Sequence, residues 1–127
     1  MEVINKNHSS ILFNKRLEKV AYINFYNENE IHFSSCAVRD LKIRIGSYVH
    51  FINEDDEWFF YINNDKDGFC VQDSNRRNNV SIYNGSLIKL FMKRTGRTWP
   101  VKYPLKETKM EQHESMVFKI EINKPIE

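Results

Sequence analysis

The sequence predicts a mostly β domain with two short helices, in which a ββαββ unit occurs twice around a pseudo-twofold axis and forms a small barrel. Three observations lead to this fold class. Apolar residues alternate with polar ones in short runs, as they do in half-buried strands. Two stretches with helical apolar spacing each follow a residue that favours helix N-caps. The order of elements in the first half of the chain recurs in the second half at an offset of 50 residues.

The first half contains four predicted strands and one helix. Ser34 or Ser35 is a suitable N-cap for a helix of about two turns, which Gly46 keeps short. The acidic stretch NEDDE, residues 53–57, is predicted to be a hairpin turn between the last two strands. In chain order, the predicted elements are strands at 20–26 and 30–33, a helix at 35–42, and strands at 47–52 and 58–63.

The second half repeats this order. Ser86 is a possible N-cap and Gly96 a helix stop. Pro100 and Pro104 restrict the stretch that follows to an edge strand or an irregular strand, because proline cannot donate to a ladder. The predicted elements are strands at 68–72 and 78–83, a helix at 86–95, an extended stretch at 97–105 and a strand at 116–123.

The two halves, about residues 20–63 and 68–123, are predicted to form a single domain over residues 20–123. Residues 1–19 are predicted to be an arm with a helical turn capped by Ser9 or Ser10. The alternative is an ordinary α+β meander with two unrelated helices. The predicted core consists of Ile31, Phe33, Leu41, Val49, Phe51, Phe60, Ile62, Val80, Ile82, Leu90, Phe91, Phe118 and Ile120.

Composition limits the class of protein. The chain has 127 residues, 41% of them hydrophobic, which is typical of one folded domain. The net charge of +2 means that any nucleic-acid-binding surface must be local. No apolar run approaches a membrane span, and the first residues lack an apolar leader, so a cytoplasmic or virion location is expected. The abundance of Asn, Ile and Lys suggests an AT-rich genome, such as that of a low-GC bacterium or a phage.

Residues 31–49, IHFSSCAVRDLKIRIGSYV, resemble the core of the AbrB-like, swapped-hairpin family. In that family a β-branched strand leads to a short helix, a Gly-Asp turn and a second strand. Two such units interlock into a small barrel in the dimer. The resemblance, which covers about residues 29–51, therefore implies that a chain with two units builds the barrel alone, as related double-psi and cradle-loop barrels do.

The chain departs from the family pattern at several positions. Ser34 stands where the family usually has Pro, Lys42 where it has Gly, and Ser47 where it has Asp. The Gly-Arg pair that the family often uses on DNA is Asn29–Glu30 here. An acidic side chain opposes a phosphate contact, so the resemblance implies the scaffold more strongly than the DNA-binding surface.

Basic residues gather on and just after the two predicted helices. If the pseudo-twofold axis holds, two matching patches would straddle a duplex and contact phosphates. The alternative is that these are ordinary solvated helix faces. The candidate nucleic-acid-binding residues are Arg39, Lys42 and Arg44 at the first helix, Lys89, Lys93, Arg94 and Arg97 at the second, and Arg76 and Arg77 in a loop.

The stretch WFFYI, residues 58–62, is apolar on both faces of a predicted strand. Such a strand is either buried on both sides or part of an interface. Trp58, Phe59 and Tyr61 are therefore candidate interface residues. The alternatives are packing in the core, or stacking on single-stranded bases.

Little in the sequence indicates catalysis, and no metal or cofactor is expected. The four histidines are scattered, and no phosphate-binding loop, nucleophile elbow or zinc-protease motif occurs. NNDKDG, residues 63–68, imitates the start of a calcium loop, but Ser74 stands where the bidentate Glu would be, so a β-turn is predicted. Cys36 and Cys70 are expected to be reduced thiols.

Two functions follow as hypotheses. The first is a non-enzymatic DNA-binding accessory or regulatory protein that contacts phosphates weakly and without sequence preference. The second is a structural or assembly protein, in a virion or another oligomer, whose partners are proteins, including further copies of itself.

Overall fold

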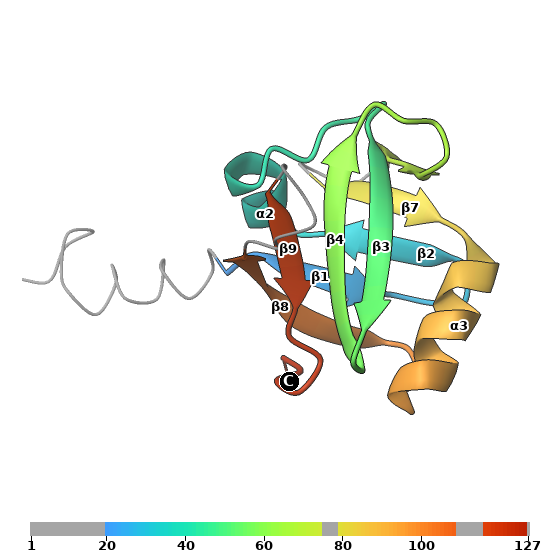
Figure 1. Cartoon of the computed structure of the whole chain (residues 1–127). Coiled ribbons are helices and arrows are strands. Elements are labelled where there is room, and N and C mark those ends of the chain that lie inside the picture. Colours follow the sequence, from blue (N-terminus) through green and yellow to red (C-terminus); the bar gives the residue numbers. More distant parts are fainter. Residues whose placement is uncertain (1–19, 75–78, 109–115, 127) are drawn as a thin grey trace, which may run out of the picture.

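The structure is a computed structural model that describes residues 20–74, 79–108 and 116–126. Nine antiparallel strands form a nearly closed small barrel with two short helices (Figure 1), so the predicted mostly β class is confirmed. The arm predicted at residues 1–19 lies outside the described residues. The elements are β1 (Tyr22–Phe25), β2 (Glu30–Phe33), α2 (Ser35–Asp40), β3 (Tyr48–Glu54), β4 (Glu57–Asn63), β5 (Phe69–Cys70), β6 (Gln72–Asp73), β7 (Val80–Tyr83), α3 (Gly85–Thr95), β8 (Val101–Thr108) and β9 (Val117–Ile120).

The strands are ordered β5-β3-β4-β9-β8-β1-β2-β7-β6 around the barrel. The strands around β1 and β2 cross those around β3 and β4 at a steep angle (Figure 1). Two segments take part in both layers. β8 pairs with β1 through its first half and with β9 through its second half. β5 and β6 are separated only by Val71, and they pair with β3 and β7 respectively.

The proline-containing stretch is an irregular strand, as predicted: β8 lies between β1 and β9 in the strand order, but each half of it is paired on one side only. Pro104 lies where β8 changes partners, so its missing N–H interrupts neither ladder. The next residue, Leu105, donates to the carbonyl of Ala21 at 3.1 Å, and the carbonyl of Pro104 accepts from the N–H of Glu121 at 3.0 Å.

The connectivity has a twofold pattern. Exchanging β1 with β5–β6, β2 with β7, β3 with β8 and β4 with β9 reproduces the observed set of strand pairings, and the pairs β2–β7 and β4–β9 map onto themselves. Each helix joins the second strand of its half to the third. The N-caps match as well: the side chain of Ser34 accepts from the N–H of Ala37, and that of Asn84 from the N–H of Leu87.

The two helices end differently. α2 ends two residues before the predicted boundary, because Leu41 is its C-cap and Lys42 adopts the left-handed conformation with φ of 58°. α3 begins one residue before the predicted start, at Gly85, and ends at Thr95. Its C-cap is the predicted Gly96, with φ of 71°.

The core fills the barrel. Three of the predicted core residues, Leu41, Phe51 and Ile62, are only half-buried. The prediction that Leu90 is buried is wrong, because 41% of this residue is exposed. At about 100° per residue, Leu90 lies roughly 130° from the middle of the buried face of α3. That face consists of Leu87, Ile88, Phe91 and Met92. The other predicted core residues are buried: Ile31, Phe33, Val49, Phe60, Val80, Ile82, Phe118 and Ile120.

Candidate functional site

The basic residues predicted beside the first helix line a groove. Two adjoining hollows, of about 550 and 530 Å³, lie between α2, the loop after it and β7, and we call the pair the α2 groove. Asp73 and Asn79 line the first hollow, and Lys42 and Arg44 line the second. Arg39, Lys42 and Arg44 are exposed along it, together with Ile45, of which 62% is exposed. Only Arg39 is paired, through its Nε to Asp40 at 2.9 Å. Within the described residues, Lys42 and Arg44 have no ion-pair partner, so two free cations face solvent in the groove.

The basic residues predicted beside the second helix form a separate surface. Lys89, Lys93, Arg94 and Arg97 are all exposed on α3 or directly after it. Arg94 donates to the side-chain oxygen of Asn53 on β3 at 2.9 Å. Among the described residues, none of these four has a carboxylate partner. Lys93 and Arg94 lie in the last turn of α3, where cations stabilise the helix dipole.

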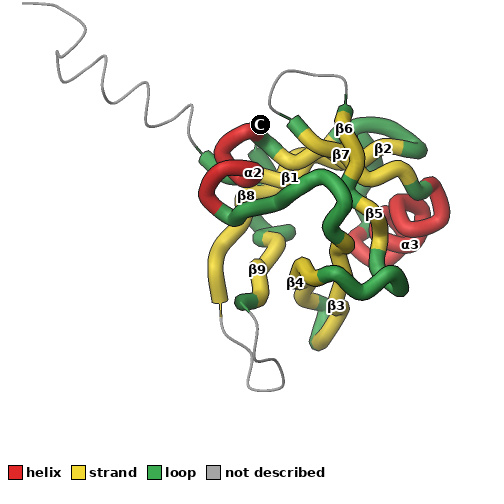
Figure 2. The backbone as a smooth tube through the Cα atoms, turned by 90° about the horizontal axis from the view of Figure 1, so that it is seen from above, coloured by secondary structure: helices red, strands yellow, loops and turns green. Residues whose placement is uncertain are grey.

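The two basic surfaces lie far apart. Figures 1 and 2 place α2 and α3 on opposite sides of the barrel. This placement gives no single face on which both patches lie side by side, and the expectation that the two patches straddle one duplex stays a prediction. The remaining predicted cations, Arg76 and Arg77, lie outside the described residues.

The three predicted interface residues differ in their accessibility. Trp58 is 3% exposed and packs in the core against Phe91, and Phe59 is 8% exposed. The strand is therefore buried on both faces within the chain, and these two residues are corrected as interface candidates. Tyr61 is half-buried and stacks on His50 with ring centroids 4.8 Å apart.

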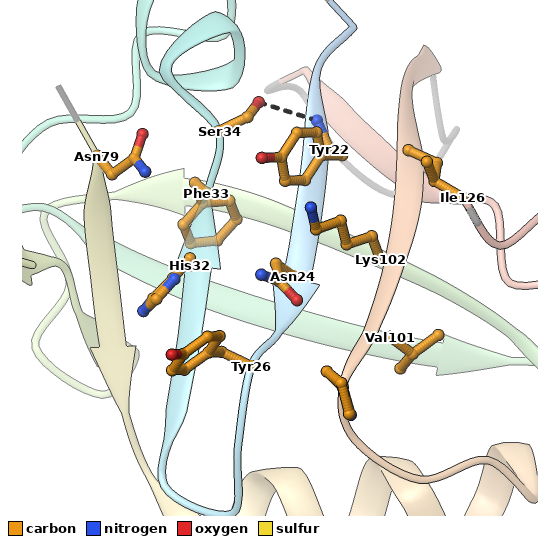
Figure 3. Close-up of a pocket in the computed structure, with 11 residues that line it drawn as sticks. Tyr22, Asn24, Tyr26, His32, Phe33, Ser34, Asn79, Val101, Lys102 and Ile126 are labelled. Atoms are coloured by element: carbon orange, nitrogen blue, oxygen red, sulfur yellow. Dashed lines mark hydrogen bonds between the residues drawn. The ribbon is translucent and has the colours of Figure 1, made fainter. Parts of the chain in front are cut away.

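A second concave surface, which the sequence did not indicate, lies on the outer face of β1, β2 and β8. Figure 3 shows its lining side chains, and its volume is about 450 Å³. We call it the outer hollow. Strand register brings a row of polar residues together across this face: Ser81 is paired with His32, His32 with Asn24, and Asn24 with Lys102. Side chains in register share a face, so residues distant in sequence form one polar row.

His32 is held firmly in this row. Only 3% of it is exposed, and its Nε2 is paired with the carboxylate of Glu30. Tyr26 stacks on its ring with centroids 4.7 Å apart, and 39% of Tyr26 is exposed. The hydroxyl of Ser81 donates to the same Glu30 carboxylate at 3.5 Å. The imidazole is thus oriented by a carboxylate on one side and an aromatic ring on the other.

Asn24 and Lys102 form the other end of the row. Asn24 is 8% exposed, and its side-chain Oδ1 is buried without a hydrogen-bond partner. Lys102 lies beside it with its ammonium 5.0 Å from the centre of the Tyr22 ring. Its backbone carbonyl accepts from the N–H of Ile126 at 2.8 Å, which brings the last described residues to the rim. A buried amide oxygen without a partner is uncommon and points to a missing donor.

The outer hollow and the α2 groove adjoin each other. Asn79 lines both, and the neighbouring residues Ser34 and Ser35 line one each. The hydroxyl of Ser34 accepts from the N–H of Tyr22 at 3.0 Å (Figure 3), which ties the start of α2 to β1 between the two surfaces. The sequence did contain one relevant signal, because Tyr22, Asn24 and Tyr26 alternate with the apolar residues of β1.

Other candidate chemistry is sparse in the described residues. They contain no group of three His, Cys, Asp or Glu side chains placed to hold a metal ion. The calcium-like stretch is a turn, as predicted, in which the side chains of Asn63 and Asp65 accept from backbone N–H groups two residues on. Cys36 and Cys70 are free thiols, and burial, together with Asp40, raises the pKa of Cys36.

None of the helices in the described part of the chain is both long and apolar enough to cross a membrane. Comparison of the chain with protein-family models, with curated proteins and with solved structures found no match.

Proposed function

We propose that the protein binds nucleic acid through phosphate contacts along the α2 groove, weakly and without sequence preference. The observation that carries this proposal is the groove itself, in which the cations of Lys42 and Arg44 face solvent without a partner among the described residues. Arg39 adds a third cation, although Asp40 partly neutralises it. Cations that are free of carboxylates can replace the counterions of a phosphate backbone.

The backbone of Lys42 supports the same proposal. Its φ of 58° is left-handed, which costs an L-residue about 1–2 kcal/mol. Residues held in such conformations cluster at functional sites. Glycine adopts this conformation without strain, and the resembling AbrB-like family has glycine at the matching position. In this chain the strained residue is Lys42, whose side chain places a cation in the groove.

The surface on α3 is proposed as a second, independent phosphate contact. Lys89, Lys93 and Arg97 are exposed there without carboxylate partners in the described chain. Because α3 lies across the barrel from α2 (Figure 2), this surface would meet a different stretch of nucleic acid or a different molecule. The effects of α3 substitutions and of groove substitutions on the binding free energy are therefore expected to be additive.

The test measures binding of a fluorescent oligonucleotide by anisotropy as the salt concentration rises. Log K is expected to fall linearly with log salt, and each lost phosphate contact flattens the slope by about 0.9 on a duplex. The informative variant combines Lys42→Gly with Arg44→Ala. Lys42→Gly relieves the left-handed strain, and Arg44→Ala changes an exposed side chain, so the variant is expected to stay folded, which its circular dichroism spectrum checks. Lys66→Ala, at an exposed cation in the loop after β4, is the matched control.

Two results would contradict the proposal. One is binding that survives a roughly fivefold rise in salt, because phosphate contacts weaken steeply over that range. The other is an equal loss of affinity in Lys66→Ala, which would mean that overall charge and not the groove determines binding.

One of the observations behind the alternative role in assembly was the strand that is apolar on both faces. Burial within the chain accounts for that pattern at Trp58 and Phe59. Tyr61 remains half-buried against His50.

We also propose that the two halves descend from one duplicated unit. The twofold pattern of strand pairings and the matching N-caps, Ser34 and Asn84, support this. The test is superposition of residues 20–63 on 68–123. If helix 35–42 and helix 86–95 fail to overlay together with their flanking strands, the duplication is refuted.

A further inference from the structure

We propose that the outer hollow binds one unpaired nucleotide, with the base against Asn24 and Tyr26 and the phosphate at Lys102. If the nucleotide is part of a single strand, this inference rests on the proposed function. If the ligand is a free mononucleotide, the inference is independent of that function. The proposal follows from three chemical groups that strand register places side by side on the face shown in Figure 3.

The first group is the amide of Asn24. Its Oδ1 is buried, has no hydrogen-bond partner and belongs to a residue that lines the hollow. A buried polar atom without a partner is costly for the fold, so the site is arranged for a ligand that supplies the bond. The ligand must offer a donor, or an acceptor if the amide is turned over. The edge of a nucleobase offers both.

The second group is aromatic. Tyr26 stacks on His32 and keeps 39% of its surface exposed at the hollow. Tyr22 on β1 and Tyr26 directly after it flank Asn24, and Tyr22 is about 6.6 Å from Asn24 along the strand. A planar ring that hydrogen-bonds to Asn24 therefore lies within reach of a tyrosine ring. Exposed aromatic residues beside cations are the usual platform for unstacked bases.

The third group is the ammonium of Lys102. It lies over the Tyr22 ring and has no carboxylate partner within the described residues. The carboxylate of Glu30 is on the other side of Asn24 and is already bound to His32. The Glu30 carboxylate, which does not line the hollow, is thus already paired, whereas the Lys102 ammonium at the hollow has no carboxylate partner in the described chain. This arrangement favours a ligand with one anionic end.

The position of the hollow makes the same ligand compatible with a strand in the groove. Asn79 lines the outer hollow and one part of the α2 groove, and Arg39 joins that part to the one that holds Lys42 and Arg44. A chain whose phosphates follow these cations can therefore continue along the groove toward the outer hollow. A base within a duplex has its edge paired and both faces stacked, and it cannot meet Asn24 and Tyr26 in this way. The site therefore predicts a preference for single strands over duplexes.

The experiment has two arms. The first follows backbone amide shifts of the labelled full chain while adenosine 5′-monophosphate, cytidine 5′-monophosphate, adenosine or inorganic phosphate is added. The second compares the affinities of a single-stranded oligonucleotide and the duplex of the same sequence by anisotropy. The variants are Tyr26→Ala and Lys102→Ala. Tyr83→Ala is the matched control, because Tyr83 is 42% exposed on the neighbouring strand β7 and does not line the hollow.

The expected result is that the monophosphates shift the amides of β1 and β8 more strongly than adenosine or phosphate alone does. The single strand should bind more tightly than the duplex. Tyr26→Ala should reduce single-strand affinity by about fivefold to 150-fold, the contribution of one stacked base, and leave duplex affinity unchanged. Tyr83→Ala should change neither, and the groove variant should weaken binding of both.

The outcomes separate the two proposals. If duplex and single strand bind equally and Tyr26→Ala has no effect, the inference fails while the groove proposal stands. If no oligonucleotide binds but mononucleotides shift the amides around the hollow, the groove proposal fails and the inference stands in its simpler form. If inorganic phosphate shifts the same amides as strongly as the monophosphates do, the hollow is an anion site and the assignment of a base is overturned.

Discussion

Replacing Phe91 with Ala should remove the side chain that joins the two layers of the barrel. Phe91 is completely buried on α3. Its ring stacks on Phe25 at 4.0 Å between centroids, and it meets Trp58 at 4.7 Å and Tyr103 at 5.8 Å. These partners come from β1, β4 and β8, so a single truncation loosens the helix and both layers together.

The expected loss is about 5 kcal/mol in the free energy of unfolding. Truncation of a buried Phe to Ala costs about 3–5 kcal/mol. The upper end applies because three ring pairs are lost, and each contributes about 0.5–1.5 kcal/mol beyond the buried area. A domain of this size is stable by about 5–15 kcal/mol, so the variant would keep at most about two thirds of its stability.

Urea unfolding followed by circular dichroism measures this loss, and the slope with urea should stay unchanged. Leu90→Ala is the matched control, one residue earlier on the same helix and 41% exposed, and it should cost less than about 0.5 kcal/mol. A cost below about 1 kcal/mol for Phe91→Ala, or similar costs for both variants, would refute the described orientation of α3.

Three further predictions concern turns, caps and pH. Asp55 and Asp56 both have positive φ in the β3–β4 hairpin turn, so Asp56→Gly should raise the unfolding free energy by about 1 kcal/mol, measurable by urea unfolding. Ser34→Ala should lower the free energy of unfolding by about 2–3 kcal/mol, against about 1 kcal/mol for the loss of a simple N-cap, because the Ser34 hydroxyl accepts from the N–H groups of both Ala37 and Tyr22. Equal losses for Ser34→Ala and Asn84→Ala would contradict this. Burial raises the pKa of Tyr103, so the folded state should lose stability as the pH rises past 10.0, the ordinary tyrosine pKa. Tyr103→Phe should remove this part of the loss, which melting temperatures measured over a pH series would show.

Local patterns were sufficient for most of the fold. Alternation and turn residues identified the strands, and Ser34, one of the two predicted caps, begins α2. The predicted cap of α3, Ser86, is wrong, because Asn84 caps that helix. The errors arose where tertiary contacts decide. Leu90 is exposed because the packing of Phe91 sets the rotation of α3. The change of partner strand at Pro104 of β8 was also not predicted. Neither fact is encoded in the immediate neighbourhood of the residue.

The candidate site divides in the same way. The groove cations follow from charge clustered around one helix, which a sequence displays directly. The outer hollow depends on strand register: Asn24, His32 and Lys102 are brought side by side only by pairings that join three separate strands. A polar face on β1 could be inferred from its alternation, but its neighbours could not.

The strand order also has a consequence for how the chain is synthesised. Within the barrel, the pair β1–β2 lies between β8 and β7, and the pair β3–β4 lies between β9 and β5, so each early hairpin waits for later strands on both sides. As the polypeptide leaves the ribosome, β1 and β4 keep an open edge until β8 and β9 have emerged near the carboxyl end. Pairing between strands that are distant in the sequence slows folding to milliseconds or longer, and the unpaired strand edges stay exposed to association with other chains during that time. Truncation before β9 is therefore expected to leave one edge of β4 and the second half of β8 without a partner strand.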